Sequence, residues 1–148
     1  MGYIDNNLVG SEKVLMIAKI HWGVYVGGIA WATIGFLLIV GDAGGAGFLA
    51  LLIGALLLLR AFIYAASTEL AITDRRVIAK FGLVRRQTVE LLHSKVEGLT
   101  VNQTILGRIL DFGTIVVNGT GSGRTPIRGI SKPLEFRRTA LAEIDSRE

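Results

Sequence analysis

The chain has 148 residues, of which 51% are hydrophobic and only 19% are charged, and its formal net charge is +4. It contains no cysteine, which excludes disulfide bridges, zinc–thiolate sites and thiol nucleophiles, and its two histidines are too far apart to indicate a metal cluster. The positive charge fits a location beside an anionic membrane leaflet, and no motif indicates nucleic-acid binding. Charge is sparse between Trp22 and Ser67, where the only formal charges are Asp42 and Arg60.

Two apolar segments follow a short N-terminal lead-in, residues 1–21. They run from Trp22 to Val40 and from Gly47 to Ala66, and a glycine-rich turn separates them. Each has close to the ~20 apolar residues that a helix needs to cross a ~30 Å hydrocarbon core. The roughly 80 residues that remain are too few to enclose two helices that are apolar on every face. The sequence therefore predicts a two-helix transmembrane hairpin over residues 22–67.

The flanking charges predict how the hairpin is oriented. Lys13 and Lys19 precede the first segment, several Lys and Arg residues follow the second, and the tip carries only Asp42. Because Lys and Arg are enriched in cytoplasmic flanks, both termini are expected in the cytoplasm.

Small residues recur four apart within the hairpin, at Gly23, Gly27, Gly28, Ala32, Ala50 and Gly54. This spacing places them on shared helix faces and predicts close helix packing, either inside the hairpin or between copies. Glycine and alanine are also common in membrane helices generally, so the alternative that the spacing has no packing role stays open. Arg60 is the one charge inside a helix. It is expected to reach the headgroups, or to form a hydrogen bond that holds an oligomer together.

After Ser67 the pattern changes to β-strands. Alternating and β-branched runs separated by turn residues predict strands at residues 69–73, 77–81, 84–92, 96–104, 114–118 and 124–130. Asn118-Gly119 is a strong hairpin signal. Pro133 is typical of a first helical turn, with Ser131 as a possible cap, and the residues after it are amphipathic. These elements predict a roll of antiparallel strands over residues 68–148, plugged by a C-terminal helix.

Several of these stretches resemble a bacterial pleckstrin-homology-like (PH-like) family of membrane proteins, the YdbS-like group, a second class of bacterial PH domains. The similar stretches before the hairpin are Glu12 within LVGSEKVL, residues 8–15, and His21-Trp22. Those after the hairpin are ELAITDRRVIAK over residues 69–80, Leu106-Gly107-Arg108, the strand FGTIVV over residues 112–117, Gly119-Thr120-Gly121, and ISKPLEF over residues 130–136. The resemblance implies a PH-type β-barrel with a C-terminal helix, located in the bacterial cytoplasmic membrane. It also implies self-assembly into homo-oligomers, but no settled biochemical activity.

Lipid-binding PH domains hold phosphates with basic residues around their first hairpin. By resemblance, the candidates for binding lipid headgroups are Arg75, Arg76, Lys80, Arg85 and Arg86. Their spacing departs from the usual phosphoinositide pattern, so general attraction to anionic headgroups is the expected interaction.

No motif for catalysis is present. The GTGSG run at residues 119–123 lacks the Gly-Lys-Ser/Thr ending of a nucleotide loop and leads into a strand. Glu90, His93 and Glu97 lack a nucleophile and a pocket signature. We therefore expect no catalytic residue, no metal, no cofactor and no enzymatic activity.

Three functions remain as hypotheses. The first is a membrane-anchored scaffold or adaptor that self-associates or docks a partner protein on an exposed sheet edge. The second is a sensor of anionic lipid headgroups. The third is a small channel or transporter, for which the hairpin offers few polar groups beyond Arg60, Thr33 and Asp42.

Overall fold

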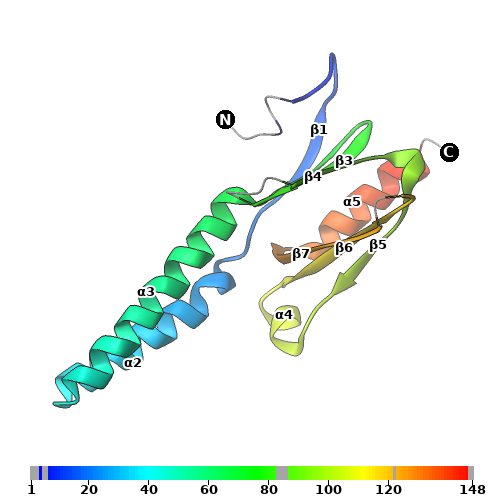
Figure 1. Cartoon of the computed structure of the whole chain (residues 1–148). Helices are drawn as coiled ribbons and strands as arrows, with labels where there is room; N and C mark the ends of the chain where they lie inside the picture. Colours follow the sequence, from blue (N-terminus) through cyan, green and yellow to red (C-terminus); the bar gives the residue numbers. More distant parts are fainter. Residues whose placement is uncertain (1–3, 5–6, 83–86, 122, 147–148) are drawn as a thin grey trace. The chain divides into compact units, whose positions relative to one another are not determined.

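A computed structural model describes residues 4, 7–82, 87–121 and 123–146, and the chain divides into two compact units (Figure 1). One unit, the sheet unit, comprises residues 1–21 together with residues 67–148. The other, the hairpin unit, comprises residues 22–66. The sequence predicts the lead-in, residues 1–21, and the β-rich part, residues 68–148, as separate segments. In the structure they belong to one unit, so the hairpin is an insertion into that unit.

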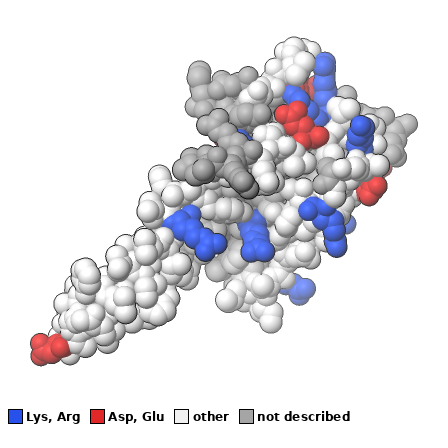
Figure 2. Space-filling model, in the orientation of Figure 1, with Lys and Arg blue, Asp and Glu red and all other residues white. Residues whose placement is uncertain are grey.

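The hairpin unit contains a short 3-10 turn, η1 (Trp22–Tyr25), and two helices, α2 (Val26–Val40) and α3 (Gly44–Ser67). By length and composition, the spans Trp22–Val40 and Gly44–Ser67 could each cross a membrane. Asp42 lies in the turn between them with φ of +62°. Helix α3 starts three residues before the predicted Gly47, because Gly44 and Gly45 join its first turn. Uncharged atoms cover nearly all of the visible hairpin (Figure 2).

The first sheet of the sheet unit has the order β1-β2-β3-β4, with all neighbours antiparallel. Its strands are β1 (Val14–Ala18), β2 (Glu69–Thr73), β3 (Arg76–Phe81) and β4 (Gln87–Leu92). Strand β1 was not predicted from the sequence. Met16 and Ala18 of this strand pack on the core, but Leu15 and Ile17 on the opposite face are apolar and exposed. With apolar residues on both faces, β1 lacks the alternation of polarity that reveals a strand.

The second sheet has the order β5-β6-β7 and is also antiparallel. A turn, η2 (His93–Lys95), leads from β4 to β5 (Val96–Asn102), and a one-turn helix, α4 (Ile105–Ile109), connects β5 to β6 (Phe112–Gly119). Strand β7 is Gly123–Ser131. The predicted hairpin is confirmed, because β6 and β7 pair antiparallel, but Asn118 and Gly119 do not form its turn. Both residues extend the β6–β7 ladder, paired with Arg124 and Gly123, and the chain reverses after them, where Gly121 has φ of +86°.

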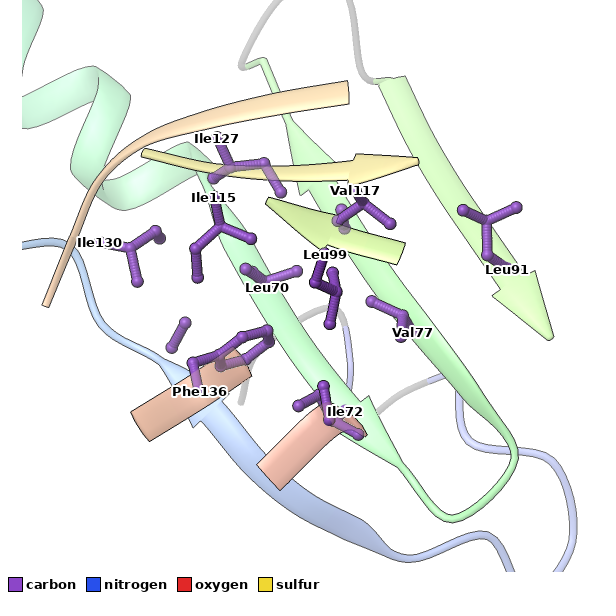
Figure 3. Close-up of a cluster of buried hydrophobic side chains, with 13 residues drawn as sticks. Leu70, Ile72, Val77, Leu91, Leu99, Ile115, Val117, Ile127, Ile130 and Phe136 are labelled. Atoms are coloured by element: carbon purple, nitrogen blue, oxygen red, sulfur yellow. The ribbon is translucent and has the colours of Figure 1, made fainter. Parts of the chain in front are cut away.

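The two sheets and the C-terminal helix α5 (Pro133–Asp145) enclose one core, which confirms the predicted PH-like architecture. Phe136 and Ala140 of α5 are fully buried. Figure 3 shows core side chains from both sheets lying opposite Phe136, among them Leu70, Ile72, Val77, Leu99, Ile115, Val117 and Ile127. The predicted cap at Ser131 is wrong. Ser131 pairs with Phe112 in the sheet, and Lys132 precedes the helix in a left-handed conformation, with φ of +50°.

The end of the β1 segment also joins the second sheet. Ile20 forms a β-bridge with Ile130, the His21 N–H donates to the Gly129 carbonyl at 2.7 Å, and the Ser131 N–H donates to the Lys19 carbonyl at 2.9 Å. The segment before the hairpin therefore contacts both sheets and closes the roll on this side.

Candidate functional site

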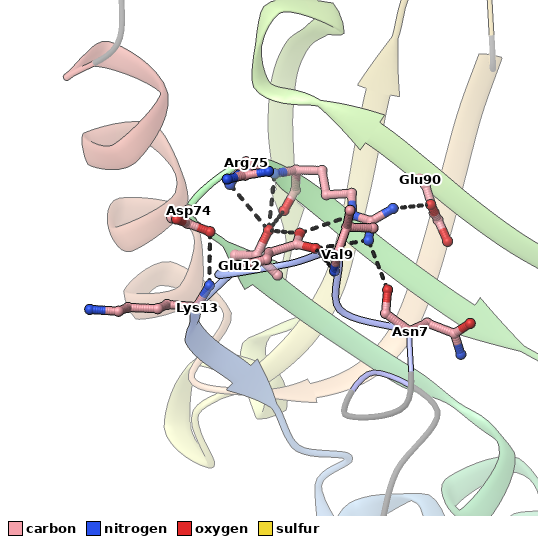
Figure 4. Close-up of polar contacts among 9 residues, drawn as sticks. Asn7, Val9, Glu12, Lys13, Asp74, Arg75 and Glu90 are labelled. Atoms are coloured by element: carbon pink, nitrogen blue, oxygen red, sulfur yellow. Dashed lines mark hydrogen bonds and ion pairs between the residues drawn. The ribbon is translucent and has the colours of Figure 1, made fainter.

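The most connected polar cluster lies where the segment before the hairpin meets the β2–β3 turn (Figure 4). The side chain of Glu12 is fully buried, and its two oxygens accept hydrogen bonds from Nε and Nη2 of Arg76, both at 2.9 Å. The Thr73 hydroxyl donates to the same carboxylate at 2.6 Å, and the Val9 N–H at 2.9 Å. Arg76 also pairs with Glu90 on β4. Both oxygens of the buried carboxylate are thus satisfied, as a buried charge requires.

These contacts keep both partners charged. The hydrogen bond from Arg76 lowers the pKa of Glu12 from 4.5 to about 2, assisted by Thr73 and Val9 and opposed by burial. The hydrogen bond to Glu12 in turn raises the pKa of Arg76. A permanently ionised and fully paired cluster suits a structural tie better than proton transfer, which needs a pKa near the working pH.

A second contact ties the same two segments together. The Lys13 N–H donates to the Asp74 carboxylate at 2.9 Å, and the Asp74 N–H donates to the Lys13 carbonyl at 3.0 Å. Asp74 belongs to the Asp-Arg-Arg turn within the stretch that resembles the PH-like family. Its role in this structure is to hold the start of β1 to the β2–β3 turn.

The five candidates for binding lipid headgroups differ in their surroundings. Arg76 is bound by Glu12 and Glu90, and the Lys80 ammonium lies 3.5 Å from the Glu69 carboxylate. Arg75 lies in the β2–β3 turn and is exposed. Arg85 and Arg86 lie outside the described residues. Two of the three described candidates are therefore neutralised within the fold, and a shared headgroup site at this hairpin stays a prediction.

The described part of the chain contains no group of three or more His, Cys, Asp or Glu side chains that could hold a metal. The three residues considered as an acid–base set have separate contacts. Glu90 binds Arg76, Glu97 accepts from the Thr120 hydroxyl at 3.1 Å, and His93 is buried with Nε2 3.0 Å from the Thr73 carbonyl oxygen. They do not converge on one reacting position.

A groove of about 670 Å³ lies between the first and second sheets. It is lined by Phe81, Gln87, Thr88, Val89, Arg124, Thr125 and Pro126. Within the described residues, β4 pairs only with β3, and residues 123–127 of β7 pair only with β6. Two strand edges that have no partner among the described residues therefore border the same groove. The sequence did not predict this groove, because the pairing partners of a strand depend on topology.

The two edges are not equivalent. Pro126 lies in the middle of β7 and has no N–H, which interrupts the row of donors along that edge. Strand β4 contains no proline, and its exposed residues Gln87 and Thr88 begin the free edge. The β4 edge is therefore the better template for an additional strand.

In the hairpin unit, α2 and α3 approach closely at glycines. A Cβ at Gly28 would lie 2.7 Å from Cγ of Leu58, and one at Gly35 would lie 2.6 Å from the backbone nitrogen of Leu51. A Cβ at Gly54 would lie 2.6 Å from the backbone nitrogen of Ala32. Such spacing leaves no room for a side chain at these glycines.

Some of the predicted packing residues lie in this seam and others do not. Gly28, Ala32 and Gly54 lie in the seam, and Ala50 is buried. A Cβ at Gly27 would meet nothing within 4 Å, and Gly23 precedes α2 in η1.

Two further glycines of the seam, Gly35 and Gly47, were missed from the sequence. Their seven-residue spacing from Gly28 and Gly54 repeats every two helical turns and is the signal that could have found them. Arg60 lies exposed on α3.

The chain matches a known protein family. The family described as the bacterial PH domain matches residues 15–144, which include most of β1, the hairpin unit, both sheets and nearly all of α5. No curated protein and no solved structure matches the chain.

Proposed function

This chain belongs to the bacterial PH domain family, and we propose that it is a non-enzymatic, membrane-anchored scaffold that binds an extended polypeptide segment along the free edge of β4. The observation that carries the proposal is the groove between β4 and β7, where a strand edge without a partner in the described residues borders a hollow large enough for side chains. Addition of a strand to such an edge is a general mode of peptide recognition.

The hairpin supplies the anchor. Its two helices are long and apolar enough to span a bilayer. Ala18 pairs with Leu70 in the β1–β2 ladder, so the chain leaves for the hairpin and returns from it at neighbouring positions. That pairing supports a hairpin that enters and leaves on one face of the membrane. The Lys and Arg flanks support the cytoplasmic face, in a bacterial cytoplasmic membrane.

The polar chemistry of the domain supports a binding role rather than catalysis. The described carboxylates and cations that come together, such as Glu12, Arg76 and Glu90, neutralise one another. The groove itself is lined by amides, hydroxyls, apolar groups and Arg124. Such a lining can hold a peptide by main-chain hydrogen bonds and accommodate alternate side chains.

The sensor of anionic headgroups is the alternative function. It has less support at the β2–β3 hairpin, because Arg76 and Lys80 already pair with carboxylates. Displacing those carboxylates would leave Glu12 buried without its partner, which is costly.

Site-specific photocrosslinking tests the scaffold. A photoreactive amino acid replaces Gln87, which is exposed on β4, in the membranes of cells that naturally produce the chain. We expect a discrete adduct, whose mass distinguishes a second copy from another protein. Adding Thr88→Arg, which places a bulky charge in the groove, should abolish the adduct. Ser94→Arg, on the exposed η2 turn, is the matched control and should preserve it. No adduct, or equal loss in both variants, would refute binding at this edge.

A further inference from the structure

The helix α4 and the residue after it present four large apolar side chains on the surface. The exposed fractions are 79% for Ile105, 66% for Leu106, 72% for Ile109 and 42% for Leu110. Single exposed apolar residues are ordinary on soluble surfaces, but four within six consecutive positions form a patch that usually marks an interaction site.

The connection that carries this patch, residues 103–111 between β5 and β6, is called the tip. Several hydrogen bonds hold it in place. The Thr104 hydroxyl caps α4 by accepting from the Gly107 N–H at 3.1 Å. The Gln103 side chain donates to the carbonyls of Gly107 at 3.2 Å and of Phe112 at 3.1 Å. A Cβ at Gly107 would lie 2.6 Å from the Phe112 carbonyl oxygen, so the chain packs tightly on itself here. The exposure of the apolar side chains is therefore a property of an ordered tip.

The tip lies at the end of the sheet unit from which the chain enters the hairpin. The His21 ring stacks on the Phe112 ring with centroids 4.9 Å apart and planes inclined by 21°. His21 directly precedes Trp22, the first residue of the first apolar span. Leu110 is two residues before Phe112, which limits their Cα separation to about 7 Å. The apolar patch thus lies close to the point where the chain would pass into lipid.

Cations accompany the patch. Arg108 of α4 and Lys19 are exposed at this end, and within the described residues no carboxylate pairs with either. Lys132 is also exposed here, but its ammonium lies 3.3 Å from the Glu135 carboxylate. Arg108 also lines a hollow of about 580 Å³ together with Gln103, Thr104 and Leu134. Apolar side chains beside basic groups match the chemistry of an anionic bilayer surface, where acyl chains lie beneath phosphates.

We propose that α4 inserts into the interface of the same bilayer that holds the hairpin. Ile105, Leu106, Ile109 and Leu110 enter the upper acyl-chain region, and Arg108 binds headgroup phosphates beside the hollow. The inference rests on the proposed membrane anchoring. It adds a second, peripheral attachment point that fixes the domain against the membrane surface.

Depth-dependent fluorescence quenching of the full chain tests this proposal. Because the natural chain has no cysteine, a single introduced cysteine carries the label without background. Ile109→Cys is labelled with an environment-sensitive fluorophore, and the chain is reconstituted in nanodiscs of phosphatidylcholine and phosphatidylglycerol, with or without nitroxide-bearing lipids. Thr120→Cys is the control, because Thr120 is exposed beyond the opposite end of β6. We expect several-fold stronger quenching by the nitroxide lipids at position 109 than at position 120.

A third label separates failure of this inference from failure of the anchoring. Leu52→Cys reports on the middle of α3, where the side chain is 48% exposed. Quenching at position 52 without quenching at position 109 would overturn insertion of α4 and leave the anchor intact. No quenching at position 52 would overturn both. A label at position 109 that is shielded from water-soluble quenchers but not reached by nitroxide lipids would mean that protein covers the patch, which also overturns the proposal.

A charge substitution provides an independent check. With the label moved to Leu106→Cys, adding Ile109→Asp should reduce lipid quenching several-fold, because a carboxylate resists entry into the acyl region. Adding Thr120→Asp should leave it unchanged. Because Ile109 is 72% exposed, the substitution does not disturb the core. Equal quenching in the two variants would contradict the proposal.

Discussion

Arg76, which follows the hairpin unit, binds both carboxylate oxygens of Glu12, which precedes that unit, with Nη2 and Oε2 2.9 Å apart. The two residues are 64 positions apart in the chain. The apolar segment therefore does not separate an extension from a domain. It interrupts a domain in which a buried ion pair joins the segment just before β1 to the start of β3.

Loss of this ion pair should destabilise the sheet unit strongly. Glu12→Ala leaves the partly buried guanidinium of Arg76 with Glu90 and the Asn7 carbonyl as partners, and removing one partner of a buried pair typically costs about 3 kcal/mol or more. Thermal unfolding of the detergent-solubilised chain should show a Tm lower by on the order of 10 °C. Glu135→Ala, which removes an exposed pair with Lys132, should change the Tm little. Similar effects of both substitutions would contradict the structural role of Glu12.

The same carboxylate should make stability depend on acid pH. Its folded pKa of about 2 lies below the ordinary value of 4.5, so its contribution is complete above pH 4.5 and is lost as the pH falls through 2. The shift corresponds to a contribution of about 3 kcal/mol. The Tm difference between the natural chain and Glu12→Gln should therefore be largest near neutral pH and shrink steadily towards pH 2. A difference that stays constant over this range would mean that Glu12 is not the group responsible.

In the hairpin, close packing should depend on particular glycines rather than on glycine content. Gly35→Ala places a Cβ 2.6 Å from the backbone nitrogen of Leu51 and must push α2 and α3 apart, at a cost of about 1–3 kcal/mol. Gly27→Ala meets nothing within 4 Å and serves as the matched control. Heat-induced aggregation in detergent should begin at a lower temperature for Gly35→Ala alone. If Gly27→Ala lowered the onset temperature more than Gly35→Ala, the face of α2 that contains Gly27 would carry the important packing instead.

The sequence predicted the elements that leave a local signal. Strand β2 was predicted with its observed bounds, Glu69–Thr73, because turn residues follow an apolar run. Helix α5 followed from Pro133 and from the spacing of Phe136 and Ala140. Strand β1 was not predicted, because Leu15 and Ile17 make its outer face apolar. Its pairing partner, β2, also follows only after the hairpin in the sequence.

The candidate site was harder to predict, because its contacts join residues that are far apart in the sequence. The basic residues of the β2–β3 hairpin were easy to find, but the carboxylate that binds Arg76 comes from a segment 64 positions away. The groove depends on which edges remain without partners after the strands of the two described sheets have paired. The apolar tip at α4 was visible only as a connector, because exposure cannot be read from a short apolar run.

The segments before and after the hairpin fold as one domain. A shortened chain in which a Gly–Ser linker replaces residues 22–66 joins His21 to Ser67, whose neighbours Ala18 and Leu70 already pair. Its amide NMR spectrum and thermal unfolding should be compared with those of residues 67–148 alone. We predict dispersed resonances and cooperative unfolding for the linked chain, and neither for residues 67–148, which lack β1 and Glu12. Equal folding of the two chains, with the same Tm, would contradict the claim.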